Sequence, residues 1–174
     1  MSKKILQHIL GYIIGGSIAL ILIPYGIFRA SRSLDHLTCI QLIPFSTLRY
    51  IISIILLVFG LLFALWSIII QNIIGKGGPL EVVNIEISPK TQNLVVTGPY
   101  RYTRNPMLFG ACIFYYAVAI YLNSIVALVI VTLFMIFMLI FVKLTEERRL
   151  LKEFGSEYEE YRQKVSMFVP WPKK

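Results

Sequence analysis

Residues 94–110 read LVVTGPYRYTRNPMLFG, and within them a polar, basic and aromatic loop gives way to a hydrophobic run. The stretch holds two prolines, two arginines, two tyrosines and two glycines in a chain that is otherwise mostly aliphatic. Pro106 suits the first turn of a helix, because proline lacks the N–H that would have no partner there. The stretch therefore predicts the start of a hydrophobic helix behind a loop that carries polar chemistry.

The composition around this stretch indicates an all-α integral membrane protein. Of the 174 residues, 57% are hydrophobic and 15% are charged, and the mean hydropathy is +0.73. Soluble domains carry about 25% charged residues. The net charge of +8 does not favour nucleic-acid binding, because the basic residues lie at the ends of apolar runs, where they set topology and contact lipid headgroups.

The apolar runs predict about four transmembrane helices, since a bilayer core needs about 20 apolar residues. Asn123 and Ser124 form a tight turn between the last two, and residues 29–46 form a mixed connector. We expect residues 1–74 to be a two-helix scaffold and residues 75–174 a catalytic region, within one structural unit. The predicted spans are Ile5 to Phe28, Leu48 to Ile74, Pro106 to Leu122 and Ile125 to Val142.

The tail after Lys143 has the pattern of an amphipathic helix. Apolar residues recur at alternating steps of three and four, which places them on one helix face. We expect this face to lie on the membrane surface or on the long polar loop, with a break at Gly155. The face is formed by Leu151, Phe154, Tyr158, Tyr161 and Val165.

Charge distribution predicts the orientation of the chain. With four spans, the N-terminus, residues 75–105 and the tail lie on one side and hold 14 of the 17 basic residues. The other side keeps Arg29, Arg32 and Arg49. The positive-inside rule therefore predicts that the polar loop and both termini are cytoplasmic.

The sequence does not indicate a metal site or a disulfide framework. Cys39 and Cys112 lie far apart without the CxxC spacing of metal sites. His36 has only Asp35 beside it, whereas zinc needs three or four converging ligands. Gly75-Lys76-Gly77 lacks the spacing and the Ser or Thr of a phosphate-binding loop.

The short turn at residues 123–124 makes the last two spans antiparallel neighbours. Arg104 and Asn105, before the third span, should then lie level with Glu146 and Glu147, after the fourth. One interpretation is a site built from an arginine and paired carboxylates at the membrane surface. The other is an interfacial cluster of salt bridges.

The stretch at residues 94–110, followed after the hairpin by TEERRLLKEFGSEYEEYRQKV and a proline, resembles the isoprenylcysteine carboxyl methyltransferase family and its phospholipid methyltransferase relatives. The resemblance covers about residues 75–170 and rests on GPYRY, R-N-P, the Glu-Glu pair and FGxxYxxY in that order. It implies a multi-helix membrane fold that binds S-adenosylmethionine on the cytosolic side and takes a lipophilic or prenylated acceptor from the bilayer.

The resemblance also implies a set of site residues. Arg104 and Glu146 would position the reactants, and methyl transfer from a sulfonium needs little beyond positioning and exclusion of water. Glu146 could accept hydrogen bonds from the cofactor's ribose or ammonium, and the first turn at Pro106 could bind its carboxylate. The implied cofactor contacts are Gln92, Asn93, Leu94, Val95, Tyr100, Asn105, Pro106, Met107, Leu108 and Glu146, with Asn84 as a weaker candidate.

Three positions depart from the family pattern. Family members often have His at Asn105 and Tyr at Leu108. Members that methylate prenylcysteine carry an arginine at the position of Val142, and Lys143 would point about 100° away around the helix. The substrate positions Val142 and Lys143 therefore leave the acceptor open among a prenylcysteine or other isoprenoid carboxylate, a lipid amine and a thiol.

Two other functions fit parts of the sequence. A membrane NADPH-dependent reductase of the sterol and steroid type resembles these methyltransferases near Arg104 and Pro106, although two carboxylates are awkward neighbours for its extra phosphate. A non-enzymatic membrane scaffold would pack through the small residues Gly11 and Gly15.

Overall fold

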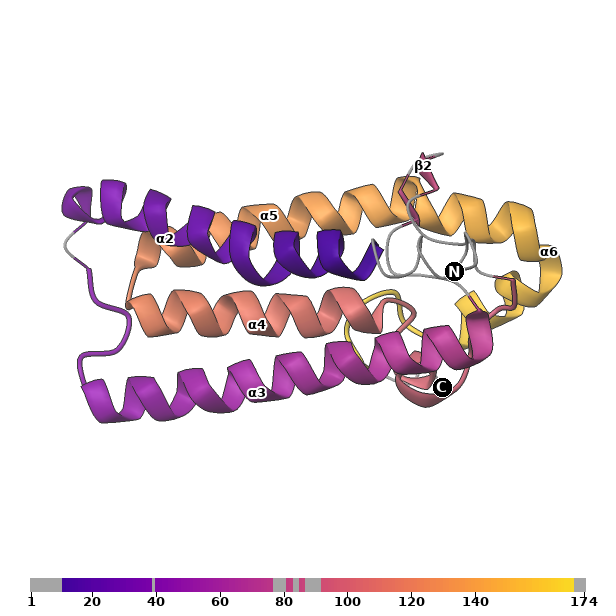
Figure 1. Ribbon diagram of the computed structural model, residues 1–174, viewed down its shortest axis with the longest axis horizontal. Helices are drawn as coiled ribbons and strands as arrows, with labels where there is room; N and C mark the ends of the chain where they lie inside the picture. The colour runs from indigo at the N-terminus through magenta and orange to yellow at the C-terminus, as the bar shows by residue number, and fades with distance from the viewer. Residues whose placement is uncertain (1–10, 39, 77–80, 83–84, 87–91, 171–174) are drawn as a thin grey trace.

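The computed structural model describes residues 11–38, 40–76, 81–82, 85–86 and 92–170. Long helices run side by side along its longest axis, and α6 folds back at one end (Figure 1). The main helices are α2 (Ile23–Leu34), α3 (Ser46–Ile70), α4 (Pro106–Leu122), α5 (Ile125–Leu144) and α6 (Glu146–Lys164). A two-residue antiparallel pair, β1 (Glu81–Val82) and β2 (Ile85–Glu86), lies between α3 and α4 in the chain.

The predicted helical membrane fold is confirmed. Within the part of the chain that the structure describes, three helical stretches are long and apolar enough to cross a membrane, namely Gly11–Leu37, Ser46–Gly75 and Ile125–Lys164. The third predicted span, α4, is apolar but has 17 residues, which extend about 26 Å at 1.5 Å per residue. Large apolar side chains lie exposed along α3 and α5, as helices that face lipid require.

The first helix extends further than the sequence predicted. The sequence predicts a mixed connector over residues 29–46, but α2 continues to Leu34 and a 3-10 turn, Asp35–Leu37, follows it. Ile27 and Ser31 are buried on one face of α2, and the Ser31 hydroxyl donates to the Phe28 carbonyl at 2.9 Å. The face that packs on α5 therefore carries the helix past the charged residues. The beginning of this span, residues 5–10, lies outside the described residues.

Helix α4 is central, because it contacts α2, α3 and α5. Cys112, Tyr115 and Ala119 recur at steps of three and four and are buried against α2 and α5. The Tyr115 hydroxyl donates to the Ala19 carbonyl at 3.0 Å, within the π-helical turn Ile18–Leu22. Such turns widen the helix and free carbonyls for outside donors.

The α3–α4 contact depends on two glycines. A Cβ built on Gly60 would lie 2.7 Å from the Gly110 carbonyl oxygen, and one on Gly110 would lie 2.7 Å from the Ala64 amide nitrogen. The backbones are thus in direct contact, which small residues permit between membrane helices.

The two turn residues between α4 and α5, Asn123 and Ser124, hold the turn in place through hydrogen bonds of their side chains. Asn123 adopts a left-handed conformation with φ of 56°, and its Oδ1 accepts the Ile43 amide at 2.9 Å. The Ser124 hydroxyl caps α5 by accepting from the Ala127 amide at 2.8 Å and donates to Asp35 Oδ1 at 2.6 Å. The two-residue turn holds α4 and α5 antiparallel, as predicted.

Helix α6 kinks at Gly155, where φ is +52° and ψ is −124°. These angles are not helical, so the predicted break at Gly155 is confirmed. A positive φ of this kind favours glycine. Beyond it, Tyr158, Tyr161 and Val165 are buried together with Leu94, Leu150 and Phe154 around them. The predicted face is wrong at Leu151, which is 37% exposed, because the kink changes the helix phase and brings Leu150 to the cluster instead.

Candidate functional site

The loop before α4 holds Tyr100 in a 3-10 turn, Gly98–Arg101, against the end of α3. The Tyr100 hydroxyl donates to Gln71 Oε1 at 2.9 Å and accepts from the Ser67 hydroxyl at 3.2 Å. Burial raises the pKa of Tyr100 to about 12, the Ser67 hydrogen bond lowers it, and the nearby charge of Glu146 raises it. Tyr100 is therefore a neutral, partly buried side chain at physiological pH, and Glu146 is close enough for its charge to raise the Tyr100 pKa.

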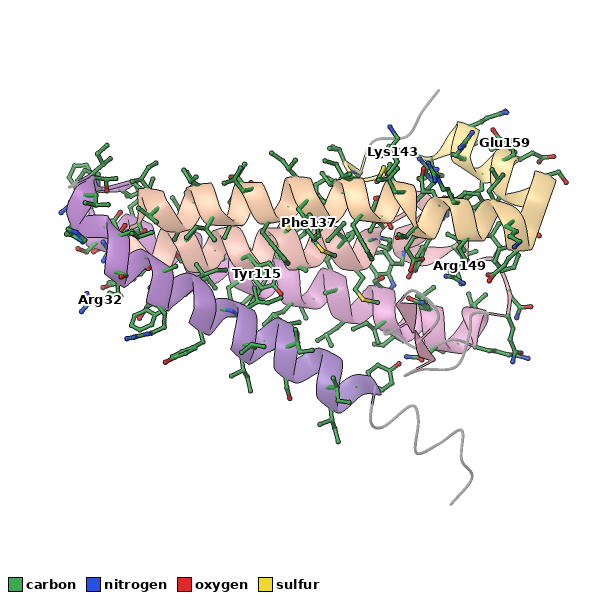
Figure 2. The ribbon with its side chains drawn as sticks, turned by 90° about the horizontal axis from the view of Figure 1, so that it is seen from above. Arg32, Tyr115, Phe137, Lys143, Arg149 and Glu159 are labelled. Carbon is green, nitrogen blue, oxygen red and sulfur yellow. The ribbon has the colours of Figure 1, made fainter. Side chains whose placement is uncertain are left out.

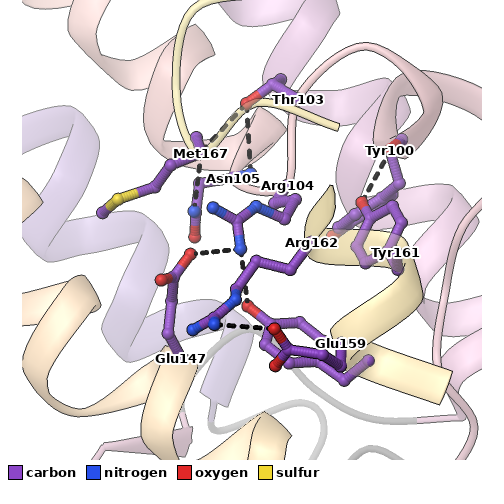
Figure 3. A network of polar contacts seen from close by, with 10 residues as sticks. Tyr100, Thr103, Arg104, Asn105, Glu147, Glu159, Tyr161, Arg162 and Met167 are labelled. Carbon is purple, nitrogen blue, oxygen red and sulfur yellow. Dashed lines mark hydrogen bonds and ion pairs between the residues drawn. The ribbon is translucent and has the colours of Figure 1, made fainter. Parts of the chain in front are cut away.

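Arg104 joins the start of α4 to the start of α6 (Figure 3). Its Nη1 lies 2.7 Å from Glu147 Oε1 and 3.4 Å from the Tyr158 hydroxyl. The contact with Glu147 is an ion pair by distance, although its N–H direction falls outside hydrogen-bond geometry. Both side chains are buried, and Arg104 Nε has no hydrogen-bond partner among the described residues.

The segment after α6 binds the loop before α4 along its backbone. Thr103 and Ser166 form a parallel bridge, and the Arg104 amide donates to the Ser166 carbonyl at 3.0 Å. The Met167 carbonyl accepts from the Thr103 hydroxyl at 3.2 Å and from Asn105 Nδ2 at 2.9 Å (Figure 3). The polar group of Asn105 is thus engaged by the chain itself.

Tyr161 completes this attachment. Its hydroxyl donates to the Tyr100 carbonyl at 2.7 Å (Figure 3). Burial raises its pKa far above the usual value, and the neighbouring Tyr100 and Tyr158 raise it further. Burial, followed by the charge of Glu147, also raises the pKa of Tyr158, to about 12.

The first turn of α4 leaves two backbone donors free. Within the described residues, the amides of Met107 and Leu108 make no hydrogen bond, whereas the Phe109 amide donates to the Asn105 carbonyl at 3.0 Å. Pro106, between them and Asn105, is buried and has no donor. Free amides at a helix start are suited to a carboxylate or phosphate.

Glu146 is the more exposed member of the Glu-Glu pair. Its Oε2 lies 3.2 Å from Arg149 Nη2, and Arg149 also binds Glu153 at 2.8 Å. The Glu146 side chain is 32% exposed, so water or a ligand reaches it. The structure thus separates the pair: Glu147 makes the buried contact with Arg104, and Glu146 stays accessible.

The remaining implied cofactor positions lie along the segment that runs from α3 toward Tyr100. The Gln92 amide donates to the Gly75 carbonyl at 2.7 Å, and Asn93 Nδ2 donates to the Ile74 carbonyl at 2.9 Å. Both side chains are exposed, while Val95 is buried and Leu94 packs against the tyrosine cluster. Asn84 lies outside the described residues.

The two substrate positions separate at the end of α5. Val142 is 8% exposed and Lys143 is exposed. Lys143 lines a cleft of about 190 Å³ with Leu144, Glu147, Arg148, Leu151 and Arg162.

Three contributors to the site were not identified from the sequence, namely Thr103, Tyr158 and Tyr161, and the sequence named Glu147 only as half of the pair without saying which glutamate meets Arg104. The two tyrosines were expected on an apolar face, but their hydroxyls also bind polar groups. Adjacent residues of a helix point about 100° apart, so Glu146 and Glu147 cannot both face Arg104. The sequence therefore indicated that only one of the two glutamates would pair with this arginine.

The sequence model of the phospholipid methyltransferase family matches residues 48–157, which is more than half of the chain. The chain belongs to the phospholipid methyltransferase family. The match begins in α3 and ends in α6, so it includes Tyr100, Arg104 and both glutamates. The predicted membership is therefore confirmed.

This family member is also similar to a curated protein, methanethiol S-methyltransferase 1 of Bradyrhizobium diazoefficiens. The two are 35% identical over 72 residues, which cover 41% of this chain and 24% of that protein. The chain therefore matches about a quarter of that relative's length. No solved structure matches the chain.

Proposed function

We propose that this protein is a membrane methyltransferase that uses S-adenosylmethionine and methylates a lipophilic acceptor by direct in-line transfer. The observation that carries the proposal is the buried contact between Arg104 and Glu147 at 2.7 Å. It joins the start of α6, where the accessible Glu146 lies, to the start of α4, where the amides of Met107 and Leu108 are free, and the charge of Glu146 also acts on Tyr100. Family membership supports the same chemistry.

The donors and acceptors around this region fit the cofactor. The carboxylate of Glu146 can accept hydrogen bonds from ribose hydroxyls or an ammonium group. The amides of Met107 and Leu108 can bind a carboxylate, and the exposed side chains of Gln92 and Asn93 offer both donors and acceptors. When bound, the cofactor would supply an electrophilic methyl group.

The chain's own residues would then act by positioning rather than by acid–base catalysis. Because Arg104 forms an ion pair with Glu147, we assign to it the role of holding α4 and α6 together. We assign cofactor binding to Glu146. Tyr100 is neutral and has its hydroxyl occupied, so its contribution is a rigid apolar surface. A site held rigid and shielded from water suits transfer to an aligned nucleophile.

We assign the acceptor side to the end of α5, where Val142 and Lys143 lie. Val142 is buried and carries no charge, so it cannot hold a carboxylate. An isoprenoid carboxylate would have to be bound by Lys143, whereas a lipid amine or a thiol needs no cation. The name of the bacterial relative adds support for a sulfur acceptor. The basic residues at this end favour a cytoplasmic site.

Calorimetric titration of the detergent-purified protein with S-adenosylhomocysteine and, separately, with NADPH tests the proposal. We expect S-adenosylhomocysteine to bind, and Glu146→Ala to weaken it by about 1.5–3 kcal/mol through loss of a charged hydrogen bond. Glu160→Ala is the matched control, because that side chain is 73% exposed and pairs only loosely with Lys164 at 3.8 Å.

Each other outcome has a definite meaning. Binding of NADPH alone would contradict the methyltransferase proposal and would favour a reductase of the sterol type. Binding of neither would favour a membrane scaffold. Unchanged affinity in Glu146→Ala would remove Glu146 from the cofactor site.

A further inference from the structure

The cleft at the junction of α5 and α6 carries two cations, Lys143 and Arg148, that lie outside the proposed cofactor site, and Lys143 also lies at the proposed acceptor side. Lys143 belongs to the last turn of α5, and Arg148 belongs to the first turn of α6. Both side chains are exposed, and among the described residues neither has a carboxylate partner.

The other charges in the cleft are already compensated. Glu147 is paired with Arg104 at 2.7 Å, and Arg162 is paired with Glu159 at 2.8 Å. Lys143 and Arg148 therefore give the cleft an uncompensated positive charge, which selects an anion. An arginine and a lysine together are typical ligands of phosphate, since arginine offers parallel N–H groups and lysine a point charge.

The position and the apolar walls of the cleft indicate where that anion comes from. Leu144 and Leu151 also line it and are 49% and 37% exposed. The cleft lies where the apolar part of α5 ends, at the depth of lipid headgroups. Its volume of about 190 Å³ is smaller than the 300–1,000 Å³ typical of sites that enclose a whole ligand. It therefore accommodates a headgroup whose acyl chains stay outside along the leucines.

The cleft is separate from the candidate cofactor region. Lys143 and Arg149, which binds Glu146, lie on opposite edges of the α5–α6 unit (Figure 2). Only Glu147 is common to the cleft and to the contacts around Arg104.

We propose that this cleft binds the phosphate of an acidic phospholipid, with Lys143 and Arg148 as its ligands and Leu144 and Leu151 against the first part of its acyl chains. Such a lipid would hold the α5–α6 junction at the membrane surface. The inference does not depend on methyl transfer, and it is tested without the cofactor.

The test measures lipid binding to the full-length protein in detergent by native mass spectrometry. Phosphatidylglycerol, phosphatidylcholine and inorganic phosphate are titrated separately. We expect phosphatidylglycerol to bind more tightly than phosphatidylcholine. Arg148→Gln should weaken it roughly 5-fold, and Lys143→Gln with Arg148→Gln roughly 25-fold, if each cation contributes independently.

Two further variants test whether a loss of lipid affinity comes from the loss of charge in the cleft. Arg148→Lys keeps the charge and should bind within about 2-fold of the wild type. Arg32→Gln removes an exposed cation at the opposite end of the molecule and should leave the affinity unchanged (Figure 2). Melting curves by circular dichroism verify that each variant folds.

Several results would overturn the proposal. These are wild-type affinity in the double variant, equal binding of phosphatidylcholine, or an equal loss in Arg32→Gln. Binding of inorganic phosphate that is lost in the double variant, with no preference among lipids, would assign the cleft to a soluble phosphate instead.

Discussion

Arg104 Nη1 and Glu147 Oε1 lie 2.7 Å apart, and their side chains are only 7% and 10% exposed. The two residues are 43 positions apart in the chain and meet because the α4–α5 hairpin returns α6 to the level at which α4 begins. A buried pair of this kind is costly to break from one side, because the remaining charge then has no partner.

Replacing Arg104 should therefore destabilise the protein strongly. We expect Arg104→Met to lower the free energy of unfolding by about 3–5 kcal/mol, since Glu147 would stay buried without a partner. Unfolding in mixed detergent micelles, followed by circular dichroism, measures this loss. The control is Lys164→Met, which removes an exposed pair and should cost no more than about 1 kcal/mol.

The double variant Arg104→Met with Glu147→Leu distinguishes the pair from its parts. Because both charges are removed together, most of the stability should return. If the single Arg104 variant loses no more stability than the Lys164 variant, the buried pair does not hold α4 to α6.

The α3–α4 contact should not accept a methyl group. Gly110→Ala would place a Cβ 2.7 Å from backbone atoms of α3, and relieving that overlap should cost about 1–3 kcal/mol in the same unfolding assay. Gly26→Ala in α2 is the control, because no heavy atom lies within 4 Å of its added Cβ. That variant should be unchanged or up to about 1 kcal/mol more stable. Equal effects of the two substitutions would contradict the close approach.

Tyr158 should make stability depend on alkaline pH. Its pKa rises from the usual value of 10 to about 12 on folding, chiefly through burial, so the folded protein favours the neutral hydroxyl. This contribution is complete below pH 10 and is lost as the pH rises through 12. Tyr158→Phe should remove it, so the variant's free energy of unfolding should fall less between these pH values. Parallel pH profiles would show that the hydroxyl titrates alike in both states.

The Ser124 hydroxyl should stabilise the turn between α4 and α5. Ser124→Ala removes the cap of α5 and leaves the Ala127 amide without its partner, which should cost about 1–2 kcal/mol in unfolding. Ser17→Ala is the control, since that side chain is exposed and caps no helix. A loss as small as that of the control would mean that water replaces the Ser124 hydroxyl at no cost.

Much of the fold follows from local features of the sequence. Apolar runs of sufficient length specify membrane helices, Pro106 begins α4, and Asn123 accepts the left-handed conformation of the turn. The predicted end of the first helix, at Phe28, was too early. Arg29 and Arg32 lie within α2, because a helix continues past charged residues when another of its faces is buried. Periodicity also failed at Leu151, since one glycine conformation changes the phase of every residue before it relative to those after it.

The candidate site was predictable as a region and less so as a set of contacts. Antiparallel pairing of α4 and α5 was enough to bring Arg104 level with the Glu-Glu pair. Which glutamate it meets depends on the rotation of α6, and this is set by the packing of Tyr158 and Tyr161 against the loop.

The sequence by itself determined that the chain is a helical membrane protein with a polar loop before α4, because hydropathy, turn residues and family motifs are local properties. Tertiary structure alone decided that Glu147 is buried with Arg104, that Glu146 stays accessible near Tyr100, and that Lys143 and Arg148 share a cleft. These contacts depend on how α6 is rotated and on its kink at Gly155. The neighbours of each side chain come from distant parts of the sequence, so local patterns cannot specify them.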